Sequence, residues 1–184
     1  MKTQILSRQS MPVSSIGFLL LVTITLIGCG ILFNINRVMR LDPVILTQDD
    51  LRMMRLTSSD RLPGNSKLSI IVGFEQRWNE SQLVIRYWLF DSAYTAKRGV
   101  DALSGTIAAE LYFYPQLSPD AVIGDATWCH LNQHTVKMSS PLLFVKDNVG
   151  VLVMTSRPSS NQLHFAQNIA RKIEAKIAAV VEKK

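Results

Sequence analysis

The sequence predicts an α+β protein, built as an antiparallel β-sheet with helices packed on one face and preceded by one N-terminal transmembrane helix. Three observations lead to this prediction: a long apolar run without charge, several short stretches rich in β-branched and aromatic residues, and two stripes of apolar residues at helical spacing. We expect four regions, namely a cytoplasmic tail over 1–15, a membrane anchor over 16–33, a stalk over 34–64 and one extracytoplasmic domain over 65–184.

The predicted membrane anchor is the run Ile16–Phe33, which contains no charged side chain. A helix of about 20 residues crosses the hydrocarbon core, whereas the apolar core of a signal peptide has about 7–15 residues, so the length favours an uncleaved anchor. Lys2 and Arg8 precede the run and would be unfavourable to translocate, which places the domain outside the cytoplasm, or in the periplasm of a Gram-negative cell. Charge alone leaves the orientation open, because four arginines follow the run: Arg37, Arg40, Arg52 and Arg55.

Cys29 lies inside the apolar run and offers a second interpretation of it. Leu26-Ile27-Gly28-Cys29 resembles the lipobox of bacterial lipoproteins, in which the chain is cleaved just before the cysteine and the cysteine is lipidated. The residues after Cys29 stay apolar, whereas those of mature lipoproteins usually turn polar. A spanning anchor is therefore favoured, and a lipoprotein lipidated at Cys29 and ordinary signal cleavage are the alternatives. Cys129 cannot pair with Cys29, so it is either a buried thiol, the commoner case, or part of an intermolecular bond.

Residues 34–64 are expected to form a stalk. They mix Arg, Asp and Met with Pro43, Pro63 and Gly64, which suits neither a strand nor a long helix. Thr47 would cap one short helix within the stalk, because its side-chain oxygen precedes acidic residues and a few apolar ones.

The core of the domain begins with two predicted strands. Apolar and polar residues alternate over Leu68–Glu75, which predicts a strand with one buried face. Asn79-Glu80-Ser81 then provides a turn. Leu83–Phe90 is rich in β-branched and aromatic residues and predicts a second strand, antiparallel to the first.

A helix is predicted directly after these strands. Asp91 or Ser92 supplies the N-cap. Apolar residues then recur at three- and four-residue spacing and form a stripe that should lie on the sheet: Ala93, Ala96, Val100, Leu103 and Ile107. Gly99 and Gly105 weaken this helix by up to about 1 kcal/mol each relative to Ala, so packing must hold it.

The remaining elements are three strands and a closing helix. Ala126–Leu131 predicts one strand. Leu142–Lys146 and Val149–Thr155 flank Asp147-Asn148, a connection suited to a tight hairpin because both residue types tolerate left-handed backbone. From Asn161 the sequence predicts a helix with one apolar side: Phe165, Ala166, Ile169, Ala170, Ile173, Ile177 and Val180.

Three stretches in the second half of the domain carry a resemblance: Gly124-Asp125-Ala126-Thr127-Trp128, Leu143–Val149 and Phe165–Ala170. They are similar to uncharacterised exported or membrane-anchored bacterial proteins in which a Gly-Asp-x-x-Trp strand precedes an "FxRxNV" hairpin and a C-terminal helix. Lys146 stands where those proteins usually have Arg. The resemblance implies the order of strand, hairpin and helix, and it brings no assigned activity.

The charge distribution argues against nucleic-acid binding. The chain has 20 Lys and Arg, 14 Asp and Glu and a net charge of +6, of which Lys2 and Arg8 contribute part before the anchor. A small excess spread among many acids is not the concentrated basic face that nucleic acids require. The expected partners are therefore the membrane, through Ile16–Phe33, and a protein of the cell envelope.

Cys129, His130 and His134 form the one cluster that suggests a metal site, since a thiolate and two imidazoles can bind zinc, copper or haem iron. In a strand, however, Cys129 and His130 point to opposite faces, and the two histidines lie about 13 Å apart unless the chain bends. No nucleophile-elbow pattern and no glycine-rich phosphate loop is present, so we expect no enzyme and no cofactor. A metal- or thiol-dependent activity centred on this cluster is the alternative.

Tyr112-Phe113-Tyr114 suggests a partner surface, because three consecutive aromatic residues cannot all face the interior from a strand. Exposed aromatic residues are enriched at protein interfaces. The expected function is therefore a non-catalytic, membrane-tethered module that binds a protein or another ligand outside the cytoplasm.

Overall fold

The computed structural model describes residues 37–111, 114–115, 122–129, 141–156 and 160–183. Residues Asn36–Lys184 form one compact unit. No helix in the described part of the chain is long and apolar enough to cross a membrane. The predicted anchor lies outside that part.

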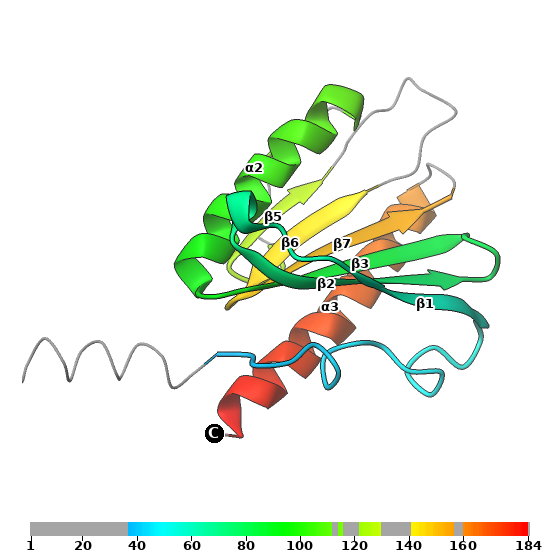
Figure 1. The fold of residues 1–184 in the computed structure, drawn as a ribbon. Coiled ribbons are helices and arrows are strands. Elements are labelled where there is room, and N and C mark those ends of the chain that lie inside the picture. Colours follow the sequence, from blue (N-terminus) through cyan, green and yellow to red (C-terminus); the bar gives the residue numbers. More distant parts are fainter. Residues whose placement is uncertain (1–36, 112–113, 116–121, 130–140, 157–159, 184) are drawn as a thin grey trace, which may run out of the picture. The chain divides into compact units, whose positions relative to one another are not determined.

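The described residues form a seven-stranded sheet in which all neighbours are antiparallel. The strands are β1 Leu56–Leu62, β2 Ile70–Trp78, β3 Leu83–Phe90, β4 Tyr114–Pro115, β5 Ala126–Cys129, β6 Leu142–Lys146 and β7 Val149–Thr155. Their order across the sheet is β1-β2-β3-β7-β6-β5-β4. Two meanders, β1 to β3 and β4 to β7, therefore meet at the central β3–β7 pair (Figure 1).

The two α-helices of the described chain, α2 Ala93–Leu111 and α3 Ser160–Glu182, lie on opposite faces of the sheet (Figure 1). The α+β class and the antiparallel sheet are confirmed, but the prediction that the helices pack on one face is wrong. The physical reason is the central strands, because β6 and β7 bury almost every side chain. A strand that is apolar on both faces needs cover on both.

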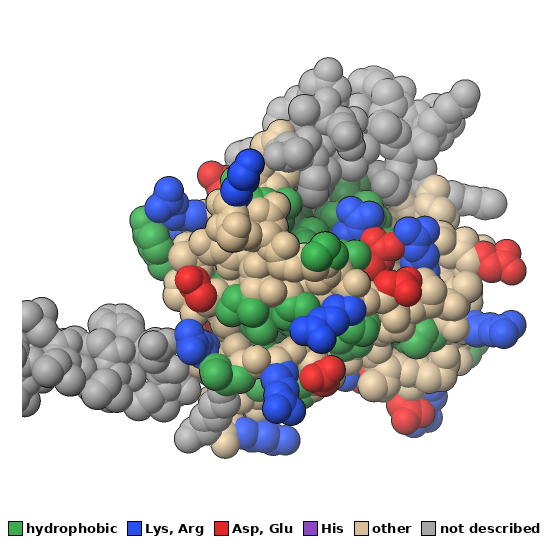
Figure 2. Space-filling view, viewed as in Figure 1, with side chains coloured by type: hydrophobic (Ala, Val, Ile, Leu, Met, Phe, Trp, Pro, Cys, Tyr) green, Lys and Arg blue, Asp and Glu red, His purple; other side chains and the backbone are tan. Residues whose placement is uncertain are grey.

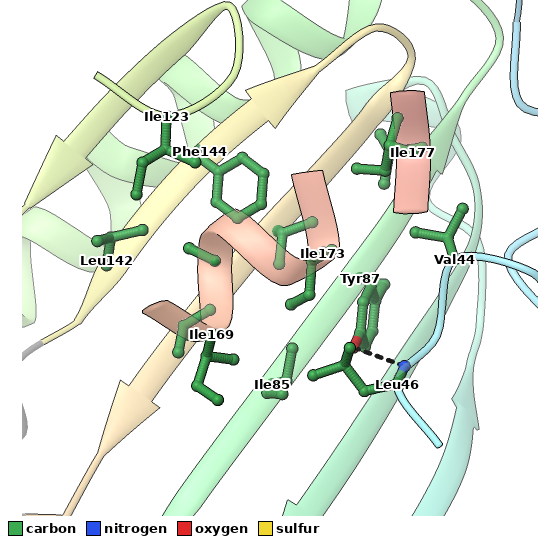
Figure 3. Close-up of a cluster of buried hydrophobic side chains, with 14 of the residues drawn as sticks. Val44, Leu46, Ile85, Tyr87, Ile123, Leu142, Phe144, Ile169, Ile173 and Ile177 are labelled. Carbon is green, nitrogen blue, oxygen red and sulfur yellow. Dashed lines mark hydrogen bonds between the residues drawn. The ribbon is translucent and has the colours of Figure 1, made fainter. Parts of the chain in front are cut away.

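The face that carries α3 is also covered by a segment without regular secondary structure, residues 37–55, which we call the strap. Its buried side chains belong to the same core as those of α3: Val38, Leu41, Val44, Leu46 and Leu51. Figure 3 shows where the strap, the sheet and α3 meet: Val44, Leu46, Ile85, Tyr87, Phe144, Ile169, Ile173 and Ile177. Together with β1, the strap fills residues 37–62, so this part of the expected stalk belongs to the domain.

The opposite core, under α2, is built around Phe90 at the end of β3. α2 approaches the sheet closely there, because a Cβ added at Gly99 would lie 2.3 Å from the ring of Phe90 and 2.9 Å from the carbonyl oxygen of Leu68. The glycine that weakens the helix locally is thus required for the helix to reach the sheet. Ser92 Oγ accepts a hydrogen bond from the Thr95 amide, which confirms Ser92 as the predicted cap.

The local predictions were most accurate where turns and strands alternate. β3, β6 and β7 have the predicted bounds, and Asn79, Glu80 and Ser81 all have positive φ in the predicted turn. In the β6–β7 hairpin, Asp147 takes the left-handed conformation with φ of 51°. The short helix expected at Thr47 is instead a series of turns, in which the amide and hydroxyl of Thr47 both donate to the carboxylate of Asp50.

Candidate functional site

A groove of about 400 Å³ opens between the strap and the strands β1 and β2. We call it the Arg40–Arg61 groove, after the two exposed basic residues among its lining. Its described lining residues are Met39, Arg40, Leu41, Asp42, Arg61, Ile71, Val72, Phe74 and Leu89. Figure 2 shows apolar side chains among basic and acidic ones over β2 and the strap.

Apolar side chains line most of this groove. Val72 and Phe74 point to the α3 face of the sheet and are only partly buried, because the strap passes beside them without covering them. Met39 is 58% exposed and Ile71 is 57% exposed. Ile71 lies at an irregularity between Ile70 and Val72, where the pairing with β3 shifts by one residue. Such a bulge re-aims a side chain away from the alternation of the strand.

The strap is fixed at its first residues by Asn148, the second residue of the β6–β7 turn. The Asn148 side chain accepts a hydrogen bond from the Val38 amide and donates to the carbonyl oxygens of Val38 and Phe90, at 2.8 to 2.9 Å. Asn148 is buried, so these bonds are shielded from water. The side chain thereby joins three segments that are distant in sequence, and the groove begins at the next residue, Met39.

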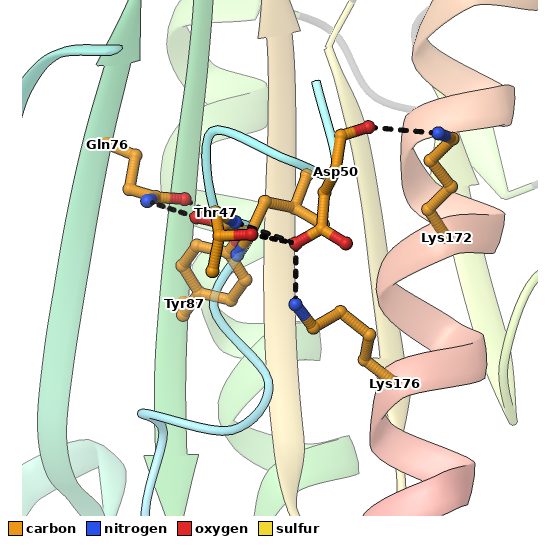
Figure 4. Close-up of polar contacts among 7 residues, drawn as sticks. Thr47, Asp50, Gln76, Tyr87, Lys172 and Lys176 are labelled. Atoms are coloured by element: carbon orange, nitrogen blue, oxygen red, sulfur yellow. Dashed lines mark hydrogen bonds and ion pairs between the residues drawn. The ribbon is translucent and has the colours of Figure 1, made fainter. Parts of the chain in front are cut away.

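A second polar network fixes the middle of the strap, as Figure 4 shows. Gln76 donates to the carbonyl oxygen of Leu46 at 2.8 Å, and the hydroxyl of Tyr87 donates to Gln76 at 3.1 Å. The Leu46 amide donates to Tyr87 Oη at 3.3 Å. Burial raises the pKa of Tyr87, so its hydroxyl stays protonated and remains a hydrogen-bond donor.

Asp50 attaches the far part of the strap to α3 (Figure 4). Lys176 Nζ lies 2.6 Å from Asp50 Oδ2, and Lys172 donates to the Asp50 carbonyl oxygen at 3.0 Å. Partial burial opposes ionisation of Asp50, but hydrogen bonds from Lys176 and Thr47 outweigh it and lower the pKa of the carboxyl. The strap is thus held to α3 at one end and to the hairpin at the other, so one wall of the groove is a preformed surface.

A charged cluster lies on the other face of β2 and β3. Glu75 is buried and paired with two partly exposed arginines, Arg77 and Arg86. Burial would raise the pKa of Glu75, but the hydrogen bonds from Arg86 and Arg77 lower it. An ionised carboxylate held by two guanidinium groups is a weak base, which suits a structural ion pair and not proton transfer.

Gly124 and Asp125, which belong to one motif of the resemblance, both contact the hairpin that carries Lys146. Gly124 has φ of 69°, and a Cβ there would lie 2.3 Å from the Val145 carbonyl oxygen. Asp125 then accepts from Lys146 Nζ at 2.9 Å and from the Asp147 amide at 2.7 Å. These contacts fix the hairpin that carries Asn148, so their role in the described structure is to position the turn.

The site residues predicted from sequence lie mostly outside the described part of the chain. Cys129 ends β5 and pairs with Tyr114 of β4 through the backbone, whereas His130 and His134 are outside. Cys29, Tyr112 and Phe113 are also outside. Among the residues that are described, no three His, Cys, Asp or Glu side chains come together as a metal site would require.

Sequence reasoning did not find the groove. Arg40 and Arg61 are separated by 20 residues in sequence, and Ile71 follows ten residues later. The sequence by itself shows Arg40 only as one of the charges after the predicted anchor. In the sequence, the pair Met39-Arg40 places an apolar residue beside a cation. Only the fold shows which residues surround this pair and form the groove.

Comparisons with known proteins assign no family to this chain. No protein-family model matches it. No curated protein matches it either.

Proposed function

We propose that the chain is a non-catalytic, membrane-tethered module whose domain lies outside the cytoplasm and binds a ligand or envelope protein in the Arg40–Arg61 groove. One observation carries this proposal: two exposed guanidinium groups flank exposed apolar side chains on a surface that Asn148 and Tyr87 hold in place. Arg and exposed apolar residues are enriched in binding surfaces. A surface that is already ordered loses less conformational entropy when it binds.

The chemistry of the described groove supports binding more than catalysis. Its lining includes one carboxylate, Asp42, and two arginines, but no serine, cysteine or histidine. Nucleophilic or general acid–base catalysis needs such groups within hydrogen-bond reach of one another. A cationic and apolar lining instead favours a ligand that carries both a negative charge and an apolar part.

Photo-crosslinking in native membranes tests the proposal. A photo-reactive amino acid at Met39 or Ile71 of the full-length chain is expected to form a defined adduct, detected by mass spectrometry. The same amino acid at Met53, which is 96% exposed and does not line the groove, is the control. Adducts at position 53 alone, or no adduct at positions 39 and 71, would contradict the proposal.

A second comparison separates this function from a metal- or thiol-dependent one. The double variant Cys129→Ser and His130→Ala removes two of the three residues on which that activity would depend. We expect the adduct at Met39 to form equally in this variant, whereas Arg40→Ala with Arg61→Ala should weaken it severalfold. An adduct that requires Cys129 and His130 would favour the alternative.

A further inference from the structure

We propose that the ligand of the Arg40–Arg61 groove is the headgroup of an anionic phospholipid in the membrane that anchors the chain. This inference rests on the proposed tethered function and names the ligand class for the same groove. It is supported by the length of the linker, the charges of the groove, the exposed apolar side chains at its rim and the surface next to it.

The linker between the predicted anchor and the groove is short. The predicted anchor ends at Phe33, and Arg37 is fixed to the domain because its guanidinium donates to the Asp91 carbonyl oxygen at 2.7 Å. Four residues span at most about 14 Å when fully extended. The polar layer on each side of the hydrocarbon core is itself about 5–8 Å thick. The groove begins two residues after Arg37, at Met39, so this linker length allows the groove to reach the headgroup layer.

The charges of the groove suit a phosphodiester. A guanidinium group binds two oxygens of a phosphate at once and is more weakly hydrated than an ammonium group. Arg40 and Arg61 supply two such groups, and Asp42 is the single acid among the described lining residues. The resulting excess of one positive charge fits the single negative charge of a diester. Near an anionic membrane surface each basic residue contributes about 1 kcal/mol of attraction.

The apolar rim suits the base of the headgroup layer, where acyl chains begin. Met39 and Ile71 are more than half exposed to solvent and lie beside the two arginines. Exposed apolar side chains next to cations are typical of surfaces that lie at the membrane interface. Water solvates these side chains poorly, whereas the boundary between headgroups and acyl chains solvates both the apolar and the charged part.

Tyr94 adds another exposed side chain with apolar and polar parts, near residue 37, where the strap begins. It lies three residues after Asp91, which holds Arg37, and it is 68% exposed. Its ring stacks with the guanidinium of Arg98 at 5.6 Å. Tyr is enriched at membrane–water interfaces. Met39, Ile71 and Tyr94 are thus three of the five large apolar side chains that are strongly exposed in the described part of the chain.

The experiment uses the full-length chain in nanodiscs that contain equal amounts of phosphatidylglycerol and phosphatidylcholine. A photo-reactive amino acid at Met39 labels the lipid that occupies the groove, and mass spectrometry gives the ratio of the two lipid adducts. With a net attraction of about 1 kcal/mol, we expect about fivefold more phosphatidylglycerol adduct. Arg40→Ala with Arg61→Ala should bring the ratio to about one.

The matched control is Arg52→Ala with Arg55→Ala, which removes the same charge from the strap but no residue of the groove. It should leave the lipid ratio unchanged, and equal thermal midpoints would show that both double variants are folded. A ratio of about one in the unaltered chain, or an equal fall in both variants, overturns the inference. A protein adduct in native membranes without any lipid adduct overturns it and leaves the proposed function intact. No adduct in either setting overturns both.

Discussion

At the scale of single residues, two glycines of α2 have opposite roles. A Cβ at Gly99 would overlap the ring of Phe90 and approach the backbone carbonyl of Leu68, which cannot turn away as a side chain can. Gly99→Ala should therefore destabilise the domain by about 1–3 kcal/mol, in spite of the better helix propensity of alanine. Chemical denaturation monitored by tryptophan fluorescence measures this change.

Gly105 is the matched control in the same helix. A Cβ there would meet no atom within 4 Å, so Gly105→Ala should stabilise the domain by about 0.5–1 kcal/mol through helix propensity alone. If Gly99→Ala stabilised the domain as much as Gly105→Ala does, α2 would not pack on Phe90 as described.

Asn148 is the residue with the largest consequence for the groove. Asn148→Ala removes three hydrogen bonds and leaves the buried groups of Val38 and Phe90 without partners. We expect a loss of about 2–4 kcal/mol, because each unsatisfied buried group costs about 1–3 kcal/mol and the structure relaxes in part. The thermal midpoint should fall by about 4–16 °C, as about 2–4 °C correspond to each kcal/mol in a domain of this size. Asp147→Asn is the control, because asparagine also adopts the left-handed conformation that the turn requires at this position. It should lower the thermal midpoint much less.

At the scale of secondary-structure elements, the accuracy of the sequence predictions follows the range of the interactions involved. β3, β6, β7 and the turn over 79–81 depend on residues that are adjacent in sequence, and all were predicted. The strap was not, because its buried residues have neither helical nor strand spacing and become core only through distant partners. The groove was missed for the same reason, since its lining comes from the strap and three strands.

The pairing of β2 with β3 includes a pH-dependent contact between Glu75 and two arginines. The pKa of Glu75 is lower in the folded than in the unfolded chain, so its contribution is fully present above the unfolded value and is lost as pH falls through the folded one. Glu75→Gln should therefore cost about 1–2 kcal/mol at neutral pH. The two chains should become similar in stability well below pH 4.5, the ordinary value for Glu. Unfolding by urea between pH 3 and pH 7 measures the difference, roughly spanning the acid range of carboxyl groups.

Asp60 is the control for this pH dependence. It pairs with Glu75 in the register of β1 and β2, but it is exposed. Asp60→Asn should change the stability by less than about 0.5 kcal/mol, as most exposed substitutions do. If Asp60→Asn and Glu75→Gln had equal effects at every pH, the buried ion pair would not be the source of the stability.

At the scale of the whole molecule, the domain has three layers, with α2 on one face of the sheet and α3 with the strap on the other (Figure 1). Among the described residues of these layers, only the strap lacks regular secondary structure. Hydrogen bonds hold one end of it and an ion pair holds the other. The start of the strap is thereby connected to Asp91 through Arg37 and to Asn148 of the β6–β7 hairpin through Val38.

The same arrangement predicts where the chain can be shortened. A chain that begins at residue 36 contains the whole compact unit and should unfold cooperatively at the midpoint of the full-length domain. A chain that begins at residue 56 lacks five buried apolar side chains, each of which contributes about 1.5–3 kcal/mol when fully buried. That loss is comparable to the whole stability of a typical domain, about 5–15 kcal/mol. The shorter chain should therefore lack a cooperative transition in calorimetry and expose apolar surface to a hydrophobic dye. If it instead unfolded at the same temperature as the longer chain, the strap would be the stalk that its composition suggested, and the groove would lose the wall on which the proposed binding depends.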